Sequence, residues 1–210
     1  MEVLVVILAY FIGNISPATI IAKSKGIDIK NAGSGNAGTT NVLRVVGKKA
    51  ALFTLIIDVG KGVVATLMGK YIYSFIPVNM TITKLIASGS DVQLNSQTLA
   101  MVCGLAAFLG HVYPVTMKFK GGKGVATALG VLLAINWHLA LICMGSAIVV
   151  TLLSRMMSLG SITAAVVCIP VAYYLEPSIL IFIIIMAAIL IYKHKGNIKR
   201  IIGGEENKLF

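Results

Sequence analysis

Acidic residues are scarce in this chain, and charge of either sign is uncommon. Its 210 residues include 7 Asp and Glu against 18 Lys and Arg, and only 12% of the residues are charged whereas 58% are hydrophobic. A water-soluble domain of this length has no use for so much apolar surface. The composition therefore excludes a soluble enzyme and predicts an integral membrane protein that forms one domain over residues 1–210.

Further absences narrow the chemistry. The three cysteines lie in apolar stretches without CxxC spacing, so disulfides and a metal site are not expected. The few carboxylates form no Asp-rich cluster of the kind that holds Mg²⁺, and we therefore predict no metal and no cofactor. No histidine begins the His-x4-Asp pattern of glycerolipid acyltransferases that use coenzyme A, and no Gly-x-Ser-x-Gly elbow for a serine nucleophile occurs.

Long apolar stretches are what the chain has in abundance. They predict an all-α protein with seven transmembrane helices, because about 20 apolar residues in a helix cross the hydrocarbon core. The first stretch lacks the basic start and the cleavage site of a signal peptide, so we interpret it as a retained span. The fourth is short, and a re-entrant helix stays an alternative there. The predicted spans are 2–22, 49–69, 97–116, 124–136, 138–153, 159–175 and 178–192.

The basic residues predict the orientation of these helices. With the N-terminus outside and the C-terminus in the cytoplasm, the outer side keeps only Lys70 and Lys84, and nearly all other basic residues fall on the inner side. We therefore interpret the net charge of +11 as a determinant of membrane topology and of binding to anionic ligands, and not as a sign of nucleic-acid binding. The outer segment 70–96 is interpreted as a surface loop without chemistry, and no obligate protein partner is evident.

Three polar islands interrupt the apolar chain, and this orientation places all of them on the cytoplasmic side. The first island runs from Gly33 to Arg44, the second from Phe119 to Gly124 and the third from His194 to Glu206. We therefore predict one composite site for phosphate-bearing substrates.

The first island has the composition of an anion-binding loop. Its glycines let backbone N–H groups turn toward a ligand, and hydroxyl and amide side chains add donors. A guanidinium fork matches the geometry of phosphate. A flexible loop with topology charges is the alternative. The candidate residues are Ser34, Gly35, Asn36, Gly38, Thr40, Asn41 and Arg44.

The second island places two lysines and four backbone N–H groups within five residues, just before a helix that we expect to begin near Val125. The partial positive charge of a helix N-terminus favours an anion at this position. The island is not a Walker A loop, because Met117 and Gly124 replace residues which that motif requires, and a nucleotide hydrolase is disfavoured. The candidates here are His111, Lys120, Gly121, Gly122 and Lys123.

The third island has polar residues at helical spacing, although alone it would be interpreted as a basic membrane anchor. Asp58 and Lys61 lie three residues apart inside the second span, where charges must pair or face a polar cavity. The connection between the fifth and sixth spans has one basic residue, which could serve topology alone. The candidates from these segments are Lys61, Arg155, Ser158, His194, Asn197 and Glu206.

The order and spacing of these motifs resemble the acyl-phosphate:glycerol-3-phosphate acyltransferases of bacteria, the PlsY family. The resemblance covers essentially the whole chain, including Asp58-x-x-Lys61-Gly62. The chain departs from the family at Lys195, where Arg is usual, and also at Gly203 and Glu205.

The resemblance implies transfer of a fatty acyl group from acyl phosphate to the sn-1 hydroxyl of glycerol 3-phosphate in the bacterial cell membrane, which yields lysophosphatidic acid and phosphate. Membrane lipid would surround the acyl chain. It also implies a catalytic set of Ser34, Arg44, Lys123, His194 and Asn197.

Two questions stay open at this point. The proton of the acceptor hydroxyl could pass to a substrate phosphate or to His194. The rival functions are a small-anion or phosphate-ester transporter, which would need polar residues near mid-bilayer in several spans, and a lipid-binding scaffold without chemistry.

Overall fold

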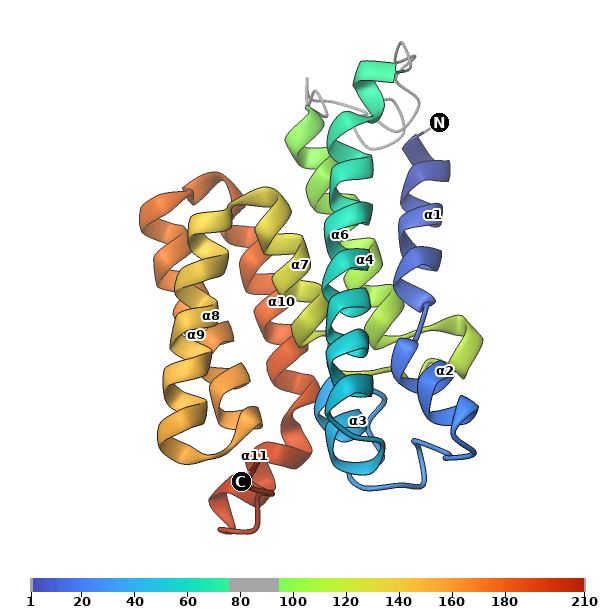
Figure 1. Cartoon of the computed structure of the whole chain (residues 1–210). Coiled ribbons are helices and arrows are strands. Elements are labelled where there is room, and N and C mark those ends of the chain that lie inside the picture. Colours follow the sequence, from blue (N-terminus) through green and yellow to red (C-terminus); the bar gives the residue numbers. More distant parts are fainter. Residues whose placement is uncertain (1, 76–94, 210) are drawn as a thin grey trace. The chain divides into compact units, whose positions relative to one another are not determined.

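The computed structural model describes residues 2–75 and 95–209, and all regular structure in these ranges is helical (Figure 1). Lys84 and most of the outer segment 70–96 lie outside the described residues. The longer elements are α1 (Glu2–Asn14), α2 (Pro17–Ser24), α3 (Thr39–Val45), α4 (Lys48–Phe75), α6 (Ser96–Val112), α7 (Val125–Ile135), α8 (Trp137–Ser154), α9 (Met157–Leu175), α10 (Leu180–Lys193) and α11 (Lys195–Ile202).

The chain divides into two compact units, Met1–Ile135 and Asn136–Phe210. The first and second islands belong to the first unit, and the third island belongs to the second unit. That the two units operate as one domain stays a prediction.

By length and composition, five helical segments of the described chain could each cross a membrane, and a sixth is possible if α10 and α11, which meet at a bend of 58°, form one broken span. Helix α7 has 11 residues, about 16 Å of helix, which is roughly half of the ~30 Å hydrocarbon core. A full span over 124–136 is therefore not observed. The structure supports an all-helical, multi-pass membrane protein, and the count of seven and the orientation remain predictions.

The first predicted span is broken into α1 and α2 at Ile15 and Ser16. Pro17 has no N–H to donate to α1, and the Ser16 hydroxyl caps the new helix by accepting from the N–H of Thr19 at 3.4 Å. Thr19 would otherwise donate to the carbonyl of Ile15. The break therefore leaves the Ile15 carbonyl oxygen available to a side chain from another helix.

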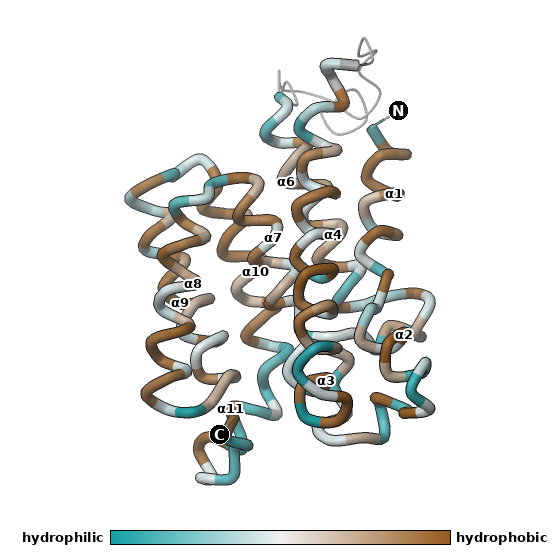
Figure 2. The backbone as a smooth tube through the Cα atoms, viewed as in Figure 1, coloured by the Kyte–Doolittle hydropathy of each residue, from teal (hydrophilic) through white to brown (hydrophobic). Residues whose placement is uncertain are grey.

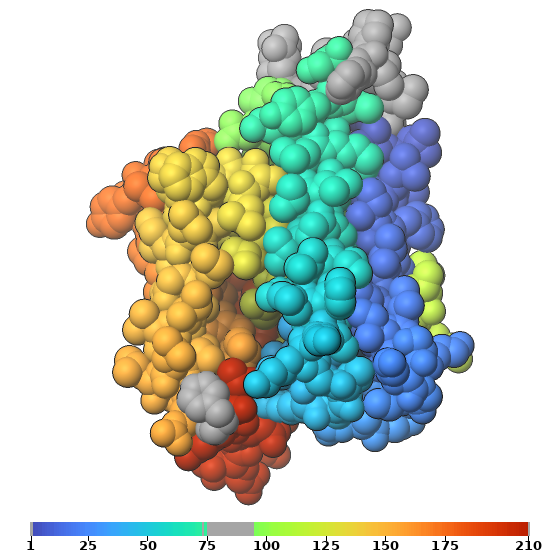
Figure 3. All heavy atoms as spheres, in the orientation of Figure 1, coloured from blue at the N-terminus to red at the C-terminus, as the bar shows by residue number. Residues whose placement is uncertain are grey.

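Glycines let the helices of the first unit approach backbone to backbone. A Cβ on Gly13 of α1 would lie 2.1 Å from the carbonyl oxygen of Ala107 on α6, and a Cβ on Gly130 of α7 would lie 2.0 Å from that of Val59 on α4. Small residues at helix contacts are typical of membrane proteins, where close packing replaces the hydrophobic effect as the driving force. Figure 3 shows α4 lying directly against α1 on one face of this unit.

Chain connectivity brings the first two islands to one end of the first unit. The first island ends in α3, just before α4 begins, and the second joins the end of α6 to the start of α7. Because α4 and α6 pack side by side in opposite directions, the start of one helix adjoins the end of the other (Figure 1). Hydrophilic residues gather at this end near α2 and α3, while hydrophobic residues follow the long helices (Figure 2).

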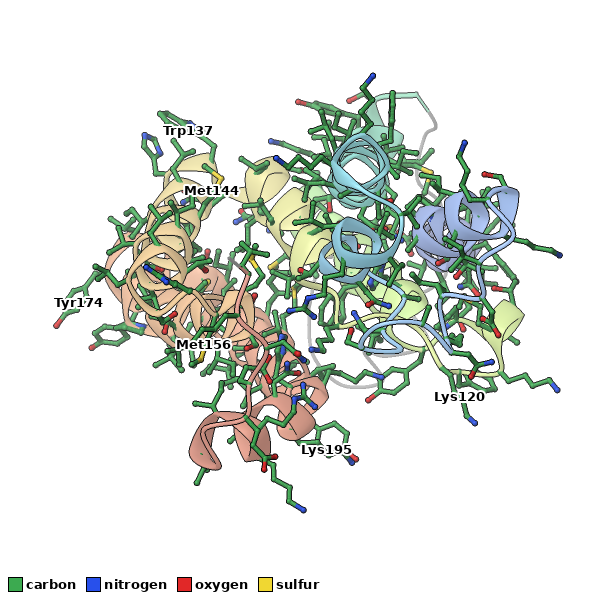
Figure 4. The ribbon with its side chains drawn as sticks, turned by 60° about the horizontal axis from the view of Figure 1, so that its bottom comes forward. Lys120, Trp137, Met144, Met156, Tyr174 and Lys195 are labelled. Carbon is green, nitrogen blue, oxygen red and sulfur yellow. The ribbon has the colours of Figure 1, made fainter. Side chains whose placement is uncertain are left out.

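The second unit packs α8 against α9 and α9 against α10. Gly160 permits the close approach of α8 and α9, because a Cβ there would lie 2.1 Å from Oγ1 of Thr151. Arg155 ends α8 in the left-handed conformation with a φ of 62°. Trp137 and Tyr174 project outward from this unit, as a lipid-facing or interfacial surface requires (Figure 4).

Candidate active site

The structure brings the first and second islands together. The ammonium of Lys30, just before the first island, donates to the carbonyl oxygen of Lys120 in the second. A Cβ on Gly122 would lie 2.9 Å from the carbonyl oxygen of Ala37. Burial and the nearby charge of Lys120 lower the pKa of Lys30. The side chain of Lys120 itself is exposed and points away from the helices (Figure 4).

Asn41 shapes the first island from the inside. Its Oδ1 accepts from the N–H of Ser34 at 2.8 Å, and its Nδ2 donates to the carbonyl oxygens of Ile29 at 3.2 Å and Ala32 at 2.9 Å. The side chain is 1% exposed. All of these contacts link parts of the segment from Ile29 to Asn41, so Asn41 positions the loop, and its contact with a substrate stays a prediction.

Glycine conformation is decisive at Gly33 and Gly35, whose φ values of 59° and 68° lie in the left-handed region. A Cβ on Gly33 would also lie 2.3 Å from Oδ1 of Asn41. This turn carries Ser34 to the surface. Ser34 and Arg44 are exposed, whereas Asn36, Gly38 and Thr40 are half-buried between them. The exposed serine and arginine keep their predicted roles as candidates.

Three backbone N–H groups of the second island donate within the protein, in contrast to the predicted convergence of four such groups on an anion. Lys120 N–H donates to the carbonyl of Met117 at 3.1 Å, and the N–H groups of Gly121 and Gly122 donate to the last carbonyls of α6 at 3.3 and 3.1 Å. Those carbonyls belong to a helix end and have no partner within their own helix, so the loop folds back to satisfy them. The anion-binding feature that remains is the start of α7, which is preceded by the half-buried Lys123.

A buried polar cluster lies between α4 and α6. The Nζ of Lys61 lies 2.7 Å from Oδ1 of Asp58 and 2.8 Å from Nδ1 of His111, and it donates to the carbonyl of Ile15 at 2.7 Å. Asp58, Lys61 and His111 are 1%, 5% and 8% exposed. The sequence left pairing of Asp58 with Lys61 and a polar cavity as alternatives, and the structure shows the pairing. It did not indicate the third member, because that contact depends on the register of α4 against α6.

Two buried hydroxyls in the described part of the first unit have no hydrogen-bond partner. They are Oγ1 of Thr39, at the start of α3, and Oγ1 of Thr127, in the first turn of α7. A buried hydroxyl without a partner costs about 1–3 kcal/mol. One such group lies in the first island and the other lies three residues beyond the second, which fits a site that receives a polar ligand. Neither residue is among the candidates predicted from the sequence.

In the second unit, Glu206 joins the third island to the turn between α8 and α9. Its Oε1 accepts from the Ser158 hydroxyl at 2.8 Å and from Nδ2 of Asn197 at 2.6 Å, and its Oε2 accepts from Nε of Arg200 at 2.8 Å. Burial raises the pKa of Glu206, but the hydrogen bonds from these three partners outweigh it and hold that pKa below its usual value. The predicted residues Ser158, Asn197 and Glu206 are thus brought together.

The turn between α8 and α9 also contacts the C-terminal tail through the backbone. The carbonyl of Arg155 accepts from the N–H of Leu209 at 2.7 Å. Arg155 itself is exposed. Arg155 therefore lies beside the C-terminal tail that follows the third island, and its role at the site stays a prediction.

His194 lies at the junction of α10 and α11 and is 2% exposed. Its Nδ1 lies 2.8 Å from the carbonyl oxygen of Leu190. A carbonyl only accepts, so Nδ1 must carry a proton, and Nε2 is the basic nitrogen of the neutral ring. This tautomer gives His194 the chemistry of a base at Nε2.

The sequence model of the family described as glycerol-3-phosphate acyltransferase matches residues 3–204. The chain belongs to this family. The resemblance found in the motifs is thereby confirmed.

Relatives in the family match over nearly their full length. A glycerol-3-phosphate acyltransferase of Thermoanaerobacter sp. (strain X514) is 42% identical over 99% of this chain and 95% of its own length. The glycerol-3-phosphate acyltransferase of Methylococcus capsulatus is 40% identical over 99% of this chain and 96% of its own.

Two crystal structures of PlsY (YgiH), an integral membrane glycerol 3-phosphate acyltransferase, share the fold. The glycerol 3-phosphate form aligns with a TM-score of 0.81 at 35% identity, over 99% of this chain and 94% of that chain. The lysophosphatidic acid form aligns with a TM-score of 0.79 over the same shares. The family's membrane fold therefore extends over essentially the whole of this chain.

Proposed function

We propose that this protein transfers a fatty acyl group from acyl phosphate to the sn-1 hydroxyl of glycerol 3-phosphate, at the cytoplasmic face of a bacterial cell membrane. The observation that carries the proposal is the full-length likeness to PlsY, an acyltransferase crystallised in a glycerol 3-phosphate form and a lysophosphatidic acid form. Those two molecules are the acceptor and the product of the reaction proposed here.

The reaction needs little from the protein beyond positioning and charge. The acceptor oxygen forms a bond to the acyl carbonyl carbon, the bond from that carbon to the phosphate oxygen breaks, and phosphate leaves with the electron pair. The hydroxyl proton passes to a phosphate oxygen of a substrate or to Nε2 of His194. Cationic groups stabilise the oxyanion and the leaving phosphate. Arg44, Lys123 and the start of α7 would supply them in the first unit.

Acyl phosphate is the proposed donor because its mixed anhydride is already activated. This fits a chain without the His-x4-Asp pattern of coenzyme A-dependent enzymes. Among the described residues no group of three His, Cys, Asp or Glu side chains is placed to hold a metal ion. A reaction without metal is therefore part of the proposal.

One experiment separates the acyltransferase from a transporter. Radiolabelled glycerol 3-phosphate is followed with purified protein, both in detergent with acyl phosphate and in sealed proteoliposomes without a donor. We expect conversion to a lipid-soluble 1-acyl product in detergent and no accumulation of unchanged glycerol 3-phosphate in the vesicles. Uptake of the unchanged label without any acylated product would overturn the proposal in favour of transport.

A further inference from the structure

The cluster of Asp58, Lys61 and His111 lies where the first and second islands meet, and the chemistry above gives its two charged members no role. All three side chains are buried in the first unit. His111 lies in the last turn of α6, and a short turn at Val115–Met117 separates it along the chain from the second island. A buried ion pair therefore lies beneath two islands that are proposed to bind phosphate.

The geometry of Lys61 fixes the direction of the hydrogen bonds. An ammonium has three protons and no acceptor. Nζ of Lys61 donates to the carbonyl of Ile15 at 2.7 Å, lies 2.8 Å from Nδ1 of His111, and forms an ion pair with Oδ1 of Asp58 at 2.7 Å. The contact with Nδ1 is therefore donated by lysine. Nδ1 holds the lone pair of the ring, and Nε2 holds its proton. The charges of Asp58 and Lys61 cancel, so a neutral histidine leaves the cluster without net charge.

The Nε2 edge of the ring faces the second island. A Cβ built on Gly122 would lie 2.2 Å from Nε2 of His111 and 2.9 Å from the carbonyl oxygen of Ala37 in the first island. The N–H of Gly122 also donates to the His111 carbonyl at 3.1 Å. The ring thus supports the point at which the two islands touch, and its orientation sets how they lie against each other.

We propose that Asp58 and Lys61 are positioning residues that hold His111 as a neutral ring protonated on Nε2, and that this ring fixes the junction of the two islands for binding of a phosphate-bearing substrate. The inference rests on the proposed function. It differs from the expectation that Lys61 itself contacts the substrate, because its buried ammonium contacts Asp58, Ile15 and His111 within the protein.

A matched pair of double variants tests this role. Both Asp58→Asn/Lys61→Met and Asp58→Leu/Lys61→Met remove the ion pair without leaving a buried charge. Only the asparagine keeps a donor for Nδ1 of His111, at the place where Oδ1 of Asp58 lies 3.3 Å from that nitrogen. We expect the leucine variant to raise the KM for one of the two substrates by roughly fivefold, the size of one lost hydrogen bond, with little change in kcat. The asparagine variant should recover most of that affinity.

Measuring KM for acyl phosphate and for glycerol 3-phosphate separately shows which phosphate the junction binds. Equal behaviour of the two double variants would overturn the proposal, since the pair would then serve only charge balance.

A second readout does not need turnover. ¹⁵N NMR of histidine-labelled protein in detergent, assigned with a His111→Asn variant, reports the tautomer of the ring. We expect the Nε2-protonated form for His111, opposite to the Nδ1-protonated form of His194. Protonation on Nδ1 of His111 would contradict the proposal even if the double variants do not fold. An inactive wild-type protein would refute the proposed function and leave the tautomer result standing.

Discussion

At the residue scale, the candidate side chains divide into those committed to the fold and those presented at the surface. Asn41 and Lys61 are surrounded by internal acceptors and donors, whereas Ser34 and Arg44 are exposed and Lys123 is half-buried before α7. Substitution of the second group should therefore change catalysis more than stability.

Arg44→Ala and Lys123→Ala should each lower kcat/KM by at least about tenfold. Loss of one charge-assisted phosphate contact costs about 1.5–3 kcal/mol, which corresponds to roughly 10- to 150-fold. Arg44→Lys should recover only part of the loss, because lysine keeps the charge without the bidentate fork. The measurement is steady-state turnover of purified protein in detergent.

Lys70→Ala is the control for these variants, since Lys70 is exposed toward the end of α4 that lies away from both islands. Near-normal turnover of both Arg44→Ala and Lys123→Ala would identify them as topology charges.

Glu206→Gln should lower the stability of the folded protein by about 1.5–3 kcal/mol at pH 7, because the carboxylate accepts three hydrogen bonds. The folded-state pKa of Glu206 is held below its usual value, so this stabilisation is complete above an unfolded pKa of about 4.3. It is lost as the pH falls through the folded-state pKa. The difference in thermal unfolding midpoint between wild type and variant should therefore shrink below about pH 4.3.

The exposed neighbour Glu205 provides the matched control, and Glu205→Gln should leave the midpoint unchanged at both pH values. A difference for Glu206→Gln that stays constant from pH 7 to pH 3 would show that the charge of the carboxylate does not matter.

At the scale of elements, glycines set the distances between helices. Helices α4 and α7 approach each other at Gly62 and Gly130, where a Cβ would lie 2.3 Å from the carbonyl oxygen of Thr127 and 2.0 Å from that of Val59. Helix α7 begins at the second island, so this packing also holds the loop in place.

Gly130→Ala should therefore separate α4 from α7 and lower stability by about 1–3 kcal/mol, the usual cost of overpacking. Gly145→Ala on α8 is the matched control, because a Cβ there meets nothing within 4 Å. It should be neutral or stabilising by up to about 1 kcal/mol through helix propensity. Thermal unfolding in detergent measures both, and equal midpoints would contradict the packing argument.

The positions of most helices could be predicted from the sequence, because the length of an apolar stretch and the polar residues that interrupt it are local signals. The predicted spans at 49–69, 97–116, 138–153 and 159–175 fall within α4, α6, α8 and α9 or extend only slightly beyond them. Ser16 and Pro17 are local signals for the break in the first span, but the sequence analysis predicted one continuous helix there. Two features depend on how the helices pack and cannot be predicted from a single segment. The amides of Gly121 and Gly122 donate to carbonyls at the end of α6, and His111 contacts Lys61.

At the scale of the whole molecule, the basic residues predict that both units present their islands to the cytoplasm. Single cysteines at Lys120 and Lys199, in a background without Cys103, Cys143 and Cys168, should be labelled from the cytoplasmic side. Lys70 should be labelled from the opposite side. All three lysines are exposed and therefore accessible to a labelling reagent. Labelling of Lys120 and Lys199 from opposite sides would refute the composite site.

The most direct test of the account is the balance of phosphate and lipid in one reaction. Purified protein in detergent receives acyl phosphate and glycerol 3-phosphate in the presence of EDTA, and free phosphate and 1-acyl-glycerol 3-phosphate are measured together. The account predicts one phosphate released for each lipid formed, no release without glycerol 3-phosphate, and little or no product when acyl-coenzyme A replaces acyl phosphate. Turnover that EDTA abolishes and Mg²⁺ restores, or product formed only from acyl-coenzyme A, would contradict it.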